Sequence, residues 1–309
     1  QRSNLLSPRF WGMLRDILRF NRQAIRDLDE QRIASDTQLG DYLQQQGYGS
    51  RFIEHYIVPM GAAIWSMSLA DMLTFPLQFF VRFFKNHGLL SVSNRPQWRV
   101  IEGGSSAYIK PLIAGFSDRI RLNCPVMQVA RNEQGVLVHS ARGTEYFDKV
   151  IFACHSDQAL SLLAKPSIAE KQILGAMPYY NNDVVLHTDT RLLPDRKLAW
   201  ASWNYRLGAA GQKRAAVTYN MNILQGIQSD ATLCVSLNQT SAIDPFKVLA
   251  SYTYAHPQYS LDAVAAQARW QELLGEQHSY FCGAYWASGF HEDGVVSALR
   301  VAQAFGQHL

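Results

Sequence analysis

The period of the hydrophobic pattern changes near residue 96, and this change restricts the chain to folds that combine helices with sheets. Before it, apolar residues recur at spacings of three and four, as in helices that pack by one face. After it, short apolar runs of strand length alternate with polar turns. The helical patterns cover 7–31, 35–48, 50–67, 72–90 and 262–274, and the strand-rich blocks cover 120–155 and 183–256. We therefore predict an α/β fold.

The composition is that of a folded protein with a sizeable core. The 309 residues are 48% hydrophobic and 17% charged. The formal net charge is only +4 and the Lys and Arg residues are scattered, so we predict no nucleic-acid partner. No apolar run approaches the roughly 18 residues of a membrane span, and no signal peptide precedes the first helical pattern. We expect a cytoplasmic protein.

Four cysteines lie in or beside apolar, strand-like runs, and none belongs to a CxxC motif or to a Cys/His pair with metal-binding spacing. They are Cys124, Cys154, Cys234 and Cys282. We predict reduced, buried thiols and no metal site.

The first helical pattern, over 7–31, carries arginines opposite its apolar stripe. These are Arg9, Arg15, Arg19, Arg22 and Arg26. Such a helix either exposes a solvated basic face over a core-facing stripe or lies on an anionic membrane surface. The pattern favours the first interpretation and leaves peripheral membrane contact open.

Two shorter features carry less information. The glycines of "VIEGGSSAY", Gly103 and Gly104, predict a strand, a turn and then a helix whose N–H groups could face an anion or cofactor, although most such turns only reverse the chain. His155 follows the strand-like run 150–153, where a histidine is more often a loop or capping residue than a catalyst.

The most informative stretch is "FCGAYWASGFHEDGVVSAL", residues 281–299. It reads as a strand ending at Gly283, an aromatic loop, and a helix with Asp293 as its N-cap. Helix N-termini carry unpaired N–H groups and a positive partial charge. Glu292 and Asp293 either cap this helix or stand beside an electron-rich ligand that its N–H groups hold.

The order of these segments resembles the flavin-containing amine oxidase superfamily. Within this superfamily, the sequence motifs are similar to those of the bacterial group of predicted NAD/FAD-binding proteins. That group is related to the flavoprotein domain of plant cyclopropane fatty acid synthases. The phrases that carry the resemblance are "NLLSPRFW", "VIFACHSDQAL", "VLHTD", "WASWNY", "VTYNMNILQ", "HPQYS" and "FCGAYWASGFHEDG", and they cover nearly the whole chain.

The resemblance implies an incomplete two-domain, FAD-dependent, amine-oxidase-like fold. Part of a Rossmann-type FAD domain would join a substrate domain made of a mixed sheet and helices. The implied segments are 1–90 for the helical part of the substrate domain, 91–160 for FAD binding, 161–275 for the rest of the substrate domain, and 276–309 for the C-terminal FAD-binding segment.

Family members open with a strand and a GxGxxG turn that holds the FAD pyrophosphate, followed by an acidic residue for the ribose. This chain has neither, since "GYGSRF" at Gly47 lies in a helical pattern and lacks the third glycine. The chain begins with Gln1 rather than Met. We therefore expect an upstream segment in the natural protein.

Carried over residue by residue, the resemblance implies cofactor contacts at strand exits and at the last helix. The candidates are Val126, Ala153, Gly283, Phe290, Gly294 and Val295. The N–H groups of Gly294 and Val295 would face the flavin pyrimidine oxygen, where they would stabilise the charge of the reduced ring. We expect the Glu292 and Asp293 carboxylates to point away from that edge. The candidate catalytic side chains are His187 and His291.

The implied activity is that of an FAD-dependent oxidoreductase in lipid metabolism, which takes a hydride from a C–H bond of an apolar, fatty-acyl-like substrate. The apolar stretches of the helical part suit such a substrate, although core packing is their commoner meaning. Amine oxidases place a Lys near the flavin in the strand that corresponds to "YYNNDVVLHTD", which has none. The alternatives are an amine oxidase and a non-catalytic partner of a lipid-modifying enzyme. The substrate, the electron acceptor and the oligomeric state stay open.

Overall fold

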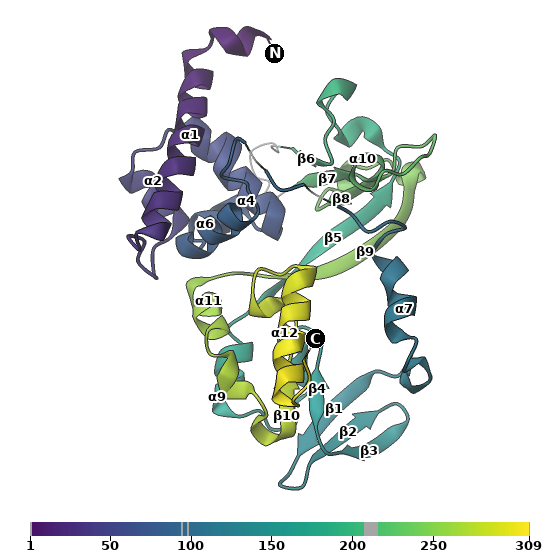
Figure 1. Ribbon diagram of the computed structural model, residues 1–309. Coiled ribbons are helices and arrows are strands. Elements are labelled where there is room, and N and C mark those ends of the chain that lie inside the picture. Colours follow the sequence, from purple (N-terminus) through teal and green to yellow (C-terminus); the bar gives the residue numbers. More distant parts are fainter. Residues whose placement is uncertain (1, 94, 98, 207–215, 309) are drawn as a thin grey trace. The chain divides into compact units, whose positions relative to one another are not determined.

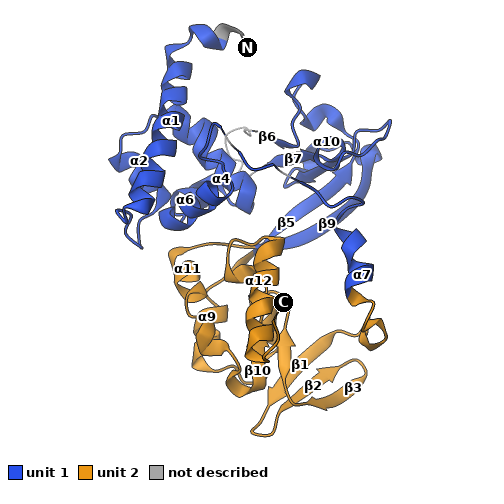
Figure 2. Ribbon diagram, in the orientation of Figure 1, with its two compact units in different colours: residues 1–112, 180–256 blue, residues 113–179, 257–309 orange. Residues whose placement is uncertain are grey.

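The computed structural model describes residues 2–93, 95–97, 99–206 and 216–308. The chain forms two compact units, each assembled from two separate stretches (Figure 2). Unit 1 contains Gln1–Leu112 and Tyr180–His256, and unit 2 contains Ile113–Tyr179 and Pro257–Leu309. The chain therefore leaves unit 1 and re-enters it before it ends in unit 2.

The first stretch of unit 1 is helical, as the hydrophobic pattern predicts (Figure 1). Its helices are α1 (Pro8–Asp29), α2 (Leu39–Gln45), α3 (Ser50–Phe52), α4 (Val58–Trp65), α5 (Leu69–Leu73) and α6 (Leu77–Asn86). A short 3-10 helix, η1 (Arg2–Leu6), precedes α1, and a π-helical turn, η2 (Ile53–Ile57), joins α3 to α4.

Aromatic side chains fill the core between these helices. Phe20 of α1 packs its ring against Phe52 and Phe80, with ring centroids 5.6 and 6.4 Å apart, and all three side chains are fully buried. Phe80 also stacks on the buried Phe84 at 4.0 Å. The apolar stretches considered as substrate lining, 9–20, 60–67 and 75–90, therefore supply much of this core.

The second stretch of unit 1 forms a five-stranded sheet with strand order β6-β7-β8-β5-β9. Its strands are β5 (Tyr179–His187), β6 (Trp203–Tyr205), β7 (Val217–Asn220), β8 (Cys234–Leu237) and β9 (Val248–Pro257). β5 pairs with β8, β8 with β7 and β7 with β6, all antiparallel. A short helix, α10 (Met221–Gln225), follows β7.

Unit 2 combines two small sheets with four helices. The strands β1 (Val126–Arg131), β2 (Val136–Ser140) and β3 (Gly143–Phe147) form an antiparallel meander, whereas β4 (Val150–Phe152) and β10 (Ser279–Phe281) pair in parallel. The helices are α8 (Ser156–Leu162), α9 (Ile168–Leu174), α11 (Leu261–Gln267) and α12 (His291–Ala304). The strand-rich block predicted over 120–155 contains the strands β1 to β4.

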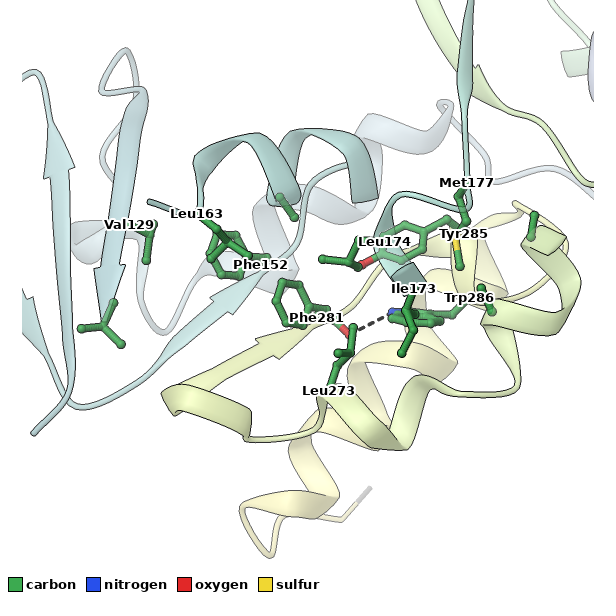
Figure 3. Close-up of a cluster of buried hydrophobic side chains, with 14 residues drawn as sticks. Val129, Phe152, Leu163, Ile173, Leu174, Met177, Leu273, Phe281, Tyr285 and Trp286 are labelled. Atoms are coloured by element: carbon green, nitrogen blue, oxygen red, sulfur yellow. Dashed lines mark hydrogen bonds between the residues drawn. The ribbon is translucent and has the colours of Figure 1, made fainter. Parts of the chain in front are cut away.

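The core of unit 2 forms around the parallel pair (Figure 3). The rings of Phe152 and Phe281 stack with centroids 5.0 Å apart. The Trp286 indole N–H donates a hydrogen bond to the Phe281 carbonyl at 3.0 Å. Phe281 and Trp286 are both buried, so β10 and the loop after it are held rigidly.

A buried ion pair ties this core to α9. The Arg131 guanidinium, at the end of β1, donates hydrogen bonds to both carboxylate oxygens of Glu170 and a further one to the Ser279 hydroxyl at 3.1 Å. Both charged side chains are almost fully buried. Burial alone would raise the pKa of Glu170, but hydrogen bonds from Arg131 and Ser167 outweigh it and hold the pKa below its usual value.

The predicted strand before Gly103 is absent from described residues 99–102. Val100 and Ile101 are about half exposed and no neighbouring strand pairs with them, so the apolar run has no sheet to join. Gly103 and Gly104 do form a turn, with φ values of 79° and 84°. The helix after them is a 3-10 turn, η3 (Ser105–Tyr108), followed by the short α7 (Ile109–Ile113).

Candidate functional site

The candidate site lies in unit 2, where the parallel strands β4 and β10 both end. The Cys282 amide continues their pairing by donating to the Phe152 carbonyl at 2.9 Å. Because parallel strands end at the same edge of a sheet, the residues after them come together there. Ala153, which is exposed, follows β4, and Gly283 follows β10. This edge is where α/β sheets bind their ligands.

Gly283 is required at the end of β10 by close packing. A Cβ atom at this position would lie 2.5 Å from the ring of Tyr285, which is only 3% exposed. The Gly283 amide donates to the Ser297 hydroxyl at 2.8 Å. That hydroxyl in turn donates to the Gly294 carbonyl at 2.8 Å. The strand exit is thereby fixed to the first turns of α12.

Helix α12 begins at His291, with Phe290 as its N-cap, so the prediction of Asp293 as the N-cap is wrong. Asp293 is the third helical residue, and its carboxylate reaches back to accept the Phe290 amide hydrogen at 2.9 Å. The Gly294 amide donates to the Phe290 carbonyl at 3.2 Å and so belongs to the helix ladder. Val295 follows it one position further into the helix and is 49% exposed.

The amides that lie at the helix end are therefore those of His291, Glu292 and Asp293. First-turn amides have no acceptor within their own helix, and none of the acceptors among the described residues bonds to these three. Together with the helix dipole, they favour an anion or an electron-rich ring, whereas the Asp293 carboxylate, bonded to the Phe290 amide, adds negative charge at the same end. Phe290 is 38% exposed beside them. The predicted contact amides, those of Gly294 and Val295, follow these three directly in the helix.

A second feature of this edge is a buried hydroxyl without a partner. Ser156, the first residue of α8, is fully buried, and its Oγ atom forms no hydrogen bond within the described part of the chain. Its amide donates to the Tyr179 hydroxyl at 3.2 Å, and the His155 ring stacks on Tyr179 with centroids 4.5 Å apart. A buried polar group without a partner is costly unless a ligand satisfies it.

These groups fit a cofactor with both anionic and aromatic parts. The edge offers unpaired helix amides, an unsatisfied serine hydroxyl and exposed apolar side chains, as binding of FAD requires. Sequence reasoning missed Ser156 and Ser297. A hydroxyl directly after a strand exit could have indicated the first, and the three-residue spacing from Gly294 on a helix could have indicated the second.

Val126 lies at the start of β1, opposite Ser140 of β2, and is 39% exposed. The register shifts between Val126 and Gln128, which bends the strand at this point. Val126 therefore lies beside an irregularity in the pairing of β1 with β2.

His187 lies in unit 1, at the end of β5, and its ring is fully buried. Its Nδ1 atom accepts the Asp189 amide hydrogen at 3.0 Å, so Nε2 carries the proton and donates to the Ser236 hydroxyl at 2.8 Å. Burial lowers the pKa of His187, against an opposing effect of the Asp189 carboxylate. The predicted role as a general base does not fit a neutral ring with both nitrogens occupied, and we assign it a structural role.

His291, the other candidate catalytic residue, is exposed at the first position of α12 in unit 2. The two histidines therefore belong to different units, and only His291 presents its ring at the surface.

The cysteines are free thiols, of which Cys234 and Cys282 are buried and Cys124 and Cys154 are partly buried. Burial raises the pKa of Cys234 to about 11. Within the described ranges, no group of three or more His, Cys, Asp or Glu side chains could hold a metal ion. A search of the same residues finds no helix with the length and apolar character that crossing a membrane requires.

Comparison with known proteins identifies both a family and a fold. The family described as flavin-containing amine oxidoreductase matches residues 5–219. No curated protein matches the chain.

Among solved structures, a CLA-producing fatty acid isomerase from P. acnes superimposes with a TM-score of 0.65 at 11% identity, covering 97% of this chain and 75% of that one. A double mutant of putrescine oxidase gives 0.66 at 13%, covering 96% and 76%. Cyclohexylamine oxidase from Brevibacterium oxydans gives 0.59 at 12%, covering 88% and 69%. The likeness confirms the predicted fold class.

Proposed function

Because the chain belongs to the family of flavin-containing amine oxidoreductases, which use FAD, we propose that this FAD-dependent oxidoreductase takes a hydride from a C–H bond of an apolar, lipid-type substrate. Bound FAD supplies the two-electron acceptor for that hydride. The protein's own contribution is to hold the cofactor, to orient the substrate and to manage the proton.

We propose that the strand exits of unit 2 hold the FAD. The amides of His291, Glu292 and Asp293 offer hydrogen bonds and positive potential where negative charge develops. Ser156 supplies a buried hydroxyl, and Gly283 keeps the strand exit in position. The family resemblance supports five further contacts in this proposal, namely Val126, Ala153, Phe290, Gly294 and Val295. His291, whose side chain is exposed at the first position of α12, is the proposed catalytic side chain.

The observation that supports an apolar substrate is the uncharged surface of β9. This ten-residue strand contains no Asp, Glu, Lys or Arg, and it exposes Leu249, Tyr252 and Tyr254 by half or more of their surface. Exposed apolar surface of this kind marks a binding site more often than a solvated face. A substrate without charge along its length fits it, and the similarity in fold to a fatty acid isomerase agrees with that class.

One observation favours an amine instead. The rings of Tyr252 and Tyr254 lie parallel, 4° apart, with centroids separated by 5.7 Å. Tyrosine faces attract cations, so this pair could bind an alkylammonium group. The fold likeness to putrescine oxidase supports the same alternative.

The test is a substrate panel on the full-length holoprotein. Fatty acids, fatty acyl esters and primary amines are each supplied with oxygen or an artificial electron acceptor, and substrate loss and hydrogen peroxide are measured. Turnover of the lipids with silence on the amines supports the proposal. Peroxide release with amines alone would establish the alternative, and a colourless protein that cannot be reconstituted with FAD would contradict both.

A further inference from the structure

Helix α1 exposes a stripe in which aromatic and aliphatic side chains alternate with arginines. Trp11, Arg15, Leu18 and Arg22 succeed one another at spacings of three and four residues, so they lie along one side of the helix. Trp11 is 54% exposed and Leu18 is 41% exposed. Large apolar side chains on successive turns of an exposed helix face are unusual unless a partner covers them.

The charge of this stripe is uncompensated. Within the described ranges, no acidic side chain pairs with Arg15 or Arg22. Asp16 and Asp27 are buried on the opposite side of the helix, and Asp29, its last residue, pairs with Lys85 of α6. The exposed face is therefore cationic.

Two other arginines border the stripe but are held by neighbours. Arg19 pairs with Asp16 at 3.4 Å and lies over the Tyr48 ring at 4.0 Å. Arg26 lies 3.8 Å from Asp27. The guanidinium groups free to meet a partner are thus those of the stripe itself.

The apolar surface continues into η1. Leu5 and Leu6 are 58% and 87% exposed, and the Trp11 indole N–H donates to the Leu5 carbonyl at 2.8 Å, which ties η1 to α1. Trp11, Leu14 and Leu18 share this face of α1 with four arginines and Gln23. Along the ribbon, η1 directly precedes α1, so these leucines lie next to the start of the stripe (Figure 1).

We propose that this face of α1 and η1 binds the surface of an anionic phospholipid bilayer. The leucines and Trp11 would enter the boundary between headgroups and acyl chains, while the arginine stems lie along the apolar surface with their charges among the phosphates. Each arginine near an anionic membrane adds to the attraction. A second copy of this chain fits less well, because a symmetric contact would bring two cationic faces together.

The experiment is co-sedimentation of the full chain with vesicles of phosphatidylcholine and with vesicles that also contain phosphatidylglycerol. We expect binding only to the anionic vesicles, weakening as salt is added. The double variant Arg15→Gln, Arg22→Gln should lower the partition coefficient on the order of 30-fold. The control Arg82→Gln removes an exposed arginine from α6 and should bind like the unmodified protein.

Trp11 provides a second readout that does not depend on charge. Brominated acyl chains should quench part of the tryptophan fluorescence, and that part should disappear in Trp11→Phe. Three results would each overturn the proposal. The protein could bind neutral and anionic vesicles equally, or the double variant could bind as well as the unmodified protein. The third is a stable dimer in solution that dissociates in the double variant. The surface lies in unit 1 and needs no FAD, so these outcomes are independent of the proposed enzymatic function.

Discussion

The hydroxyl of Ser297 accepts the amide hydrogen of Gly283 at 2.8 Å and donates its own to the Gly294 carbonyl at the same distance. One side chain, only 3% exposed, therefore joins the end of β10 to the first turns of α12. These are the elements to which we assign the FAD contacts. The relationship makes Ser297 a positioning residue, which sets the spacing between the strand exit and the helix without facing the ligand.

Replacing Ser297 by alanine should loosen this junction. The Gly283 amide would be left without its acceptor, which costs about 1–3 kcal/mol of unfolding free energy. Urea unfolding measures that loss, and the holoprotein should retain a smaller fraction of its FAD after dialysis. Ser161→Ala, at an exposed position of α8, is the control and should change neither quantity. Full FAD retention with reduced stability would show that Ser297 serves the fold alone.

Two glycines of the site should respond in opposite directions to alanine. A Cβ at Gly283 would lie 2.5 Å from the Tyr285 ring, whereas a Cβ at Gly294 would lie 3.9 Å from the Ala284 amide nitrogen, which is an ordinary contact. Gly283→Ala should therefore destabilise the protein by about 1–3 kcal/mol through overpacking. Gly294→Ala, inside α12, should stabilise it by up to about 1 kcal/mol. The same denaturation series measures both, and equal effects would contradict the packing that the structure shows.

The buried imidazole of His187 should make stability depend on pH. In the folded protein its pKa lies below the usual value near 6.5. Between these two pKa values, the ring binds a proton in the unfolded chain but stays neutral in the folded protein. Stability should therefore fall as the pH drops from about 6.5 towards the folded pKa, by at most about 1.4 kcal/mol per pH unit. His187→Gln should lose stability overall but show a flatter pH profile over this window. An equally steep profile would assign the titration to another group.

The pair Tyr252 and Tyr254 discriminates between the two substrate classes. Tyr252→Leu keeps an apolar side chain but removes the aromatic face, so lipid turnover should change little. An amine would lose a cation–π contact of about 0.5–2 kcal/mol, or roughly 2- to 30-fold in kcat/KM. Tyr146→Leu, at a similarly exposed tyrosine of β3, controls for general effects of the substitution. If kcat/KM for the lipid falls by the same factor, the aromatic ring of Tyr252 contributes to lipid binding and the pair does not discriminate between the two classes.

The fold class and the family could be predicted because they rest on long patterns. Helix α1 follows from its apolar spacing, and the order of strand exits and turns identifies the family without any single decisive residue. The strand before Gly103 could not be predicted correctly, because the apolar run that suggests it says nothing about whether a neighbouring strand exists.

The details of the site depend on choices that the sequence leaves open. In "FHEDG" an aspartate can cap the helix from the N-cap or from its third position, and the structure has the second arrangement. His187 lies two residues from Val185, which is 1% exposed, and the alternation of strand side chains could have placed both on the core face. In the sequence, the aromatic residues of α6 are equally compatible with a core and with a substrate cavity. Their burial in the structure shows that they belong to the core.

The most direct measurement of the central claim is anaerobic reduction of the flavin in the full-length holoprotein by a matched pair of compounds. The pair consists of a long-chain fatty acid and the primary amine of the same chain length, so that only the headgroup differs. We predict that the fatty acid bleaches the oxidised flavin band in a single turnover while the amine leaves it unchanged. Bleaching by the amine alone would contradict the account.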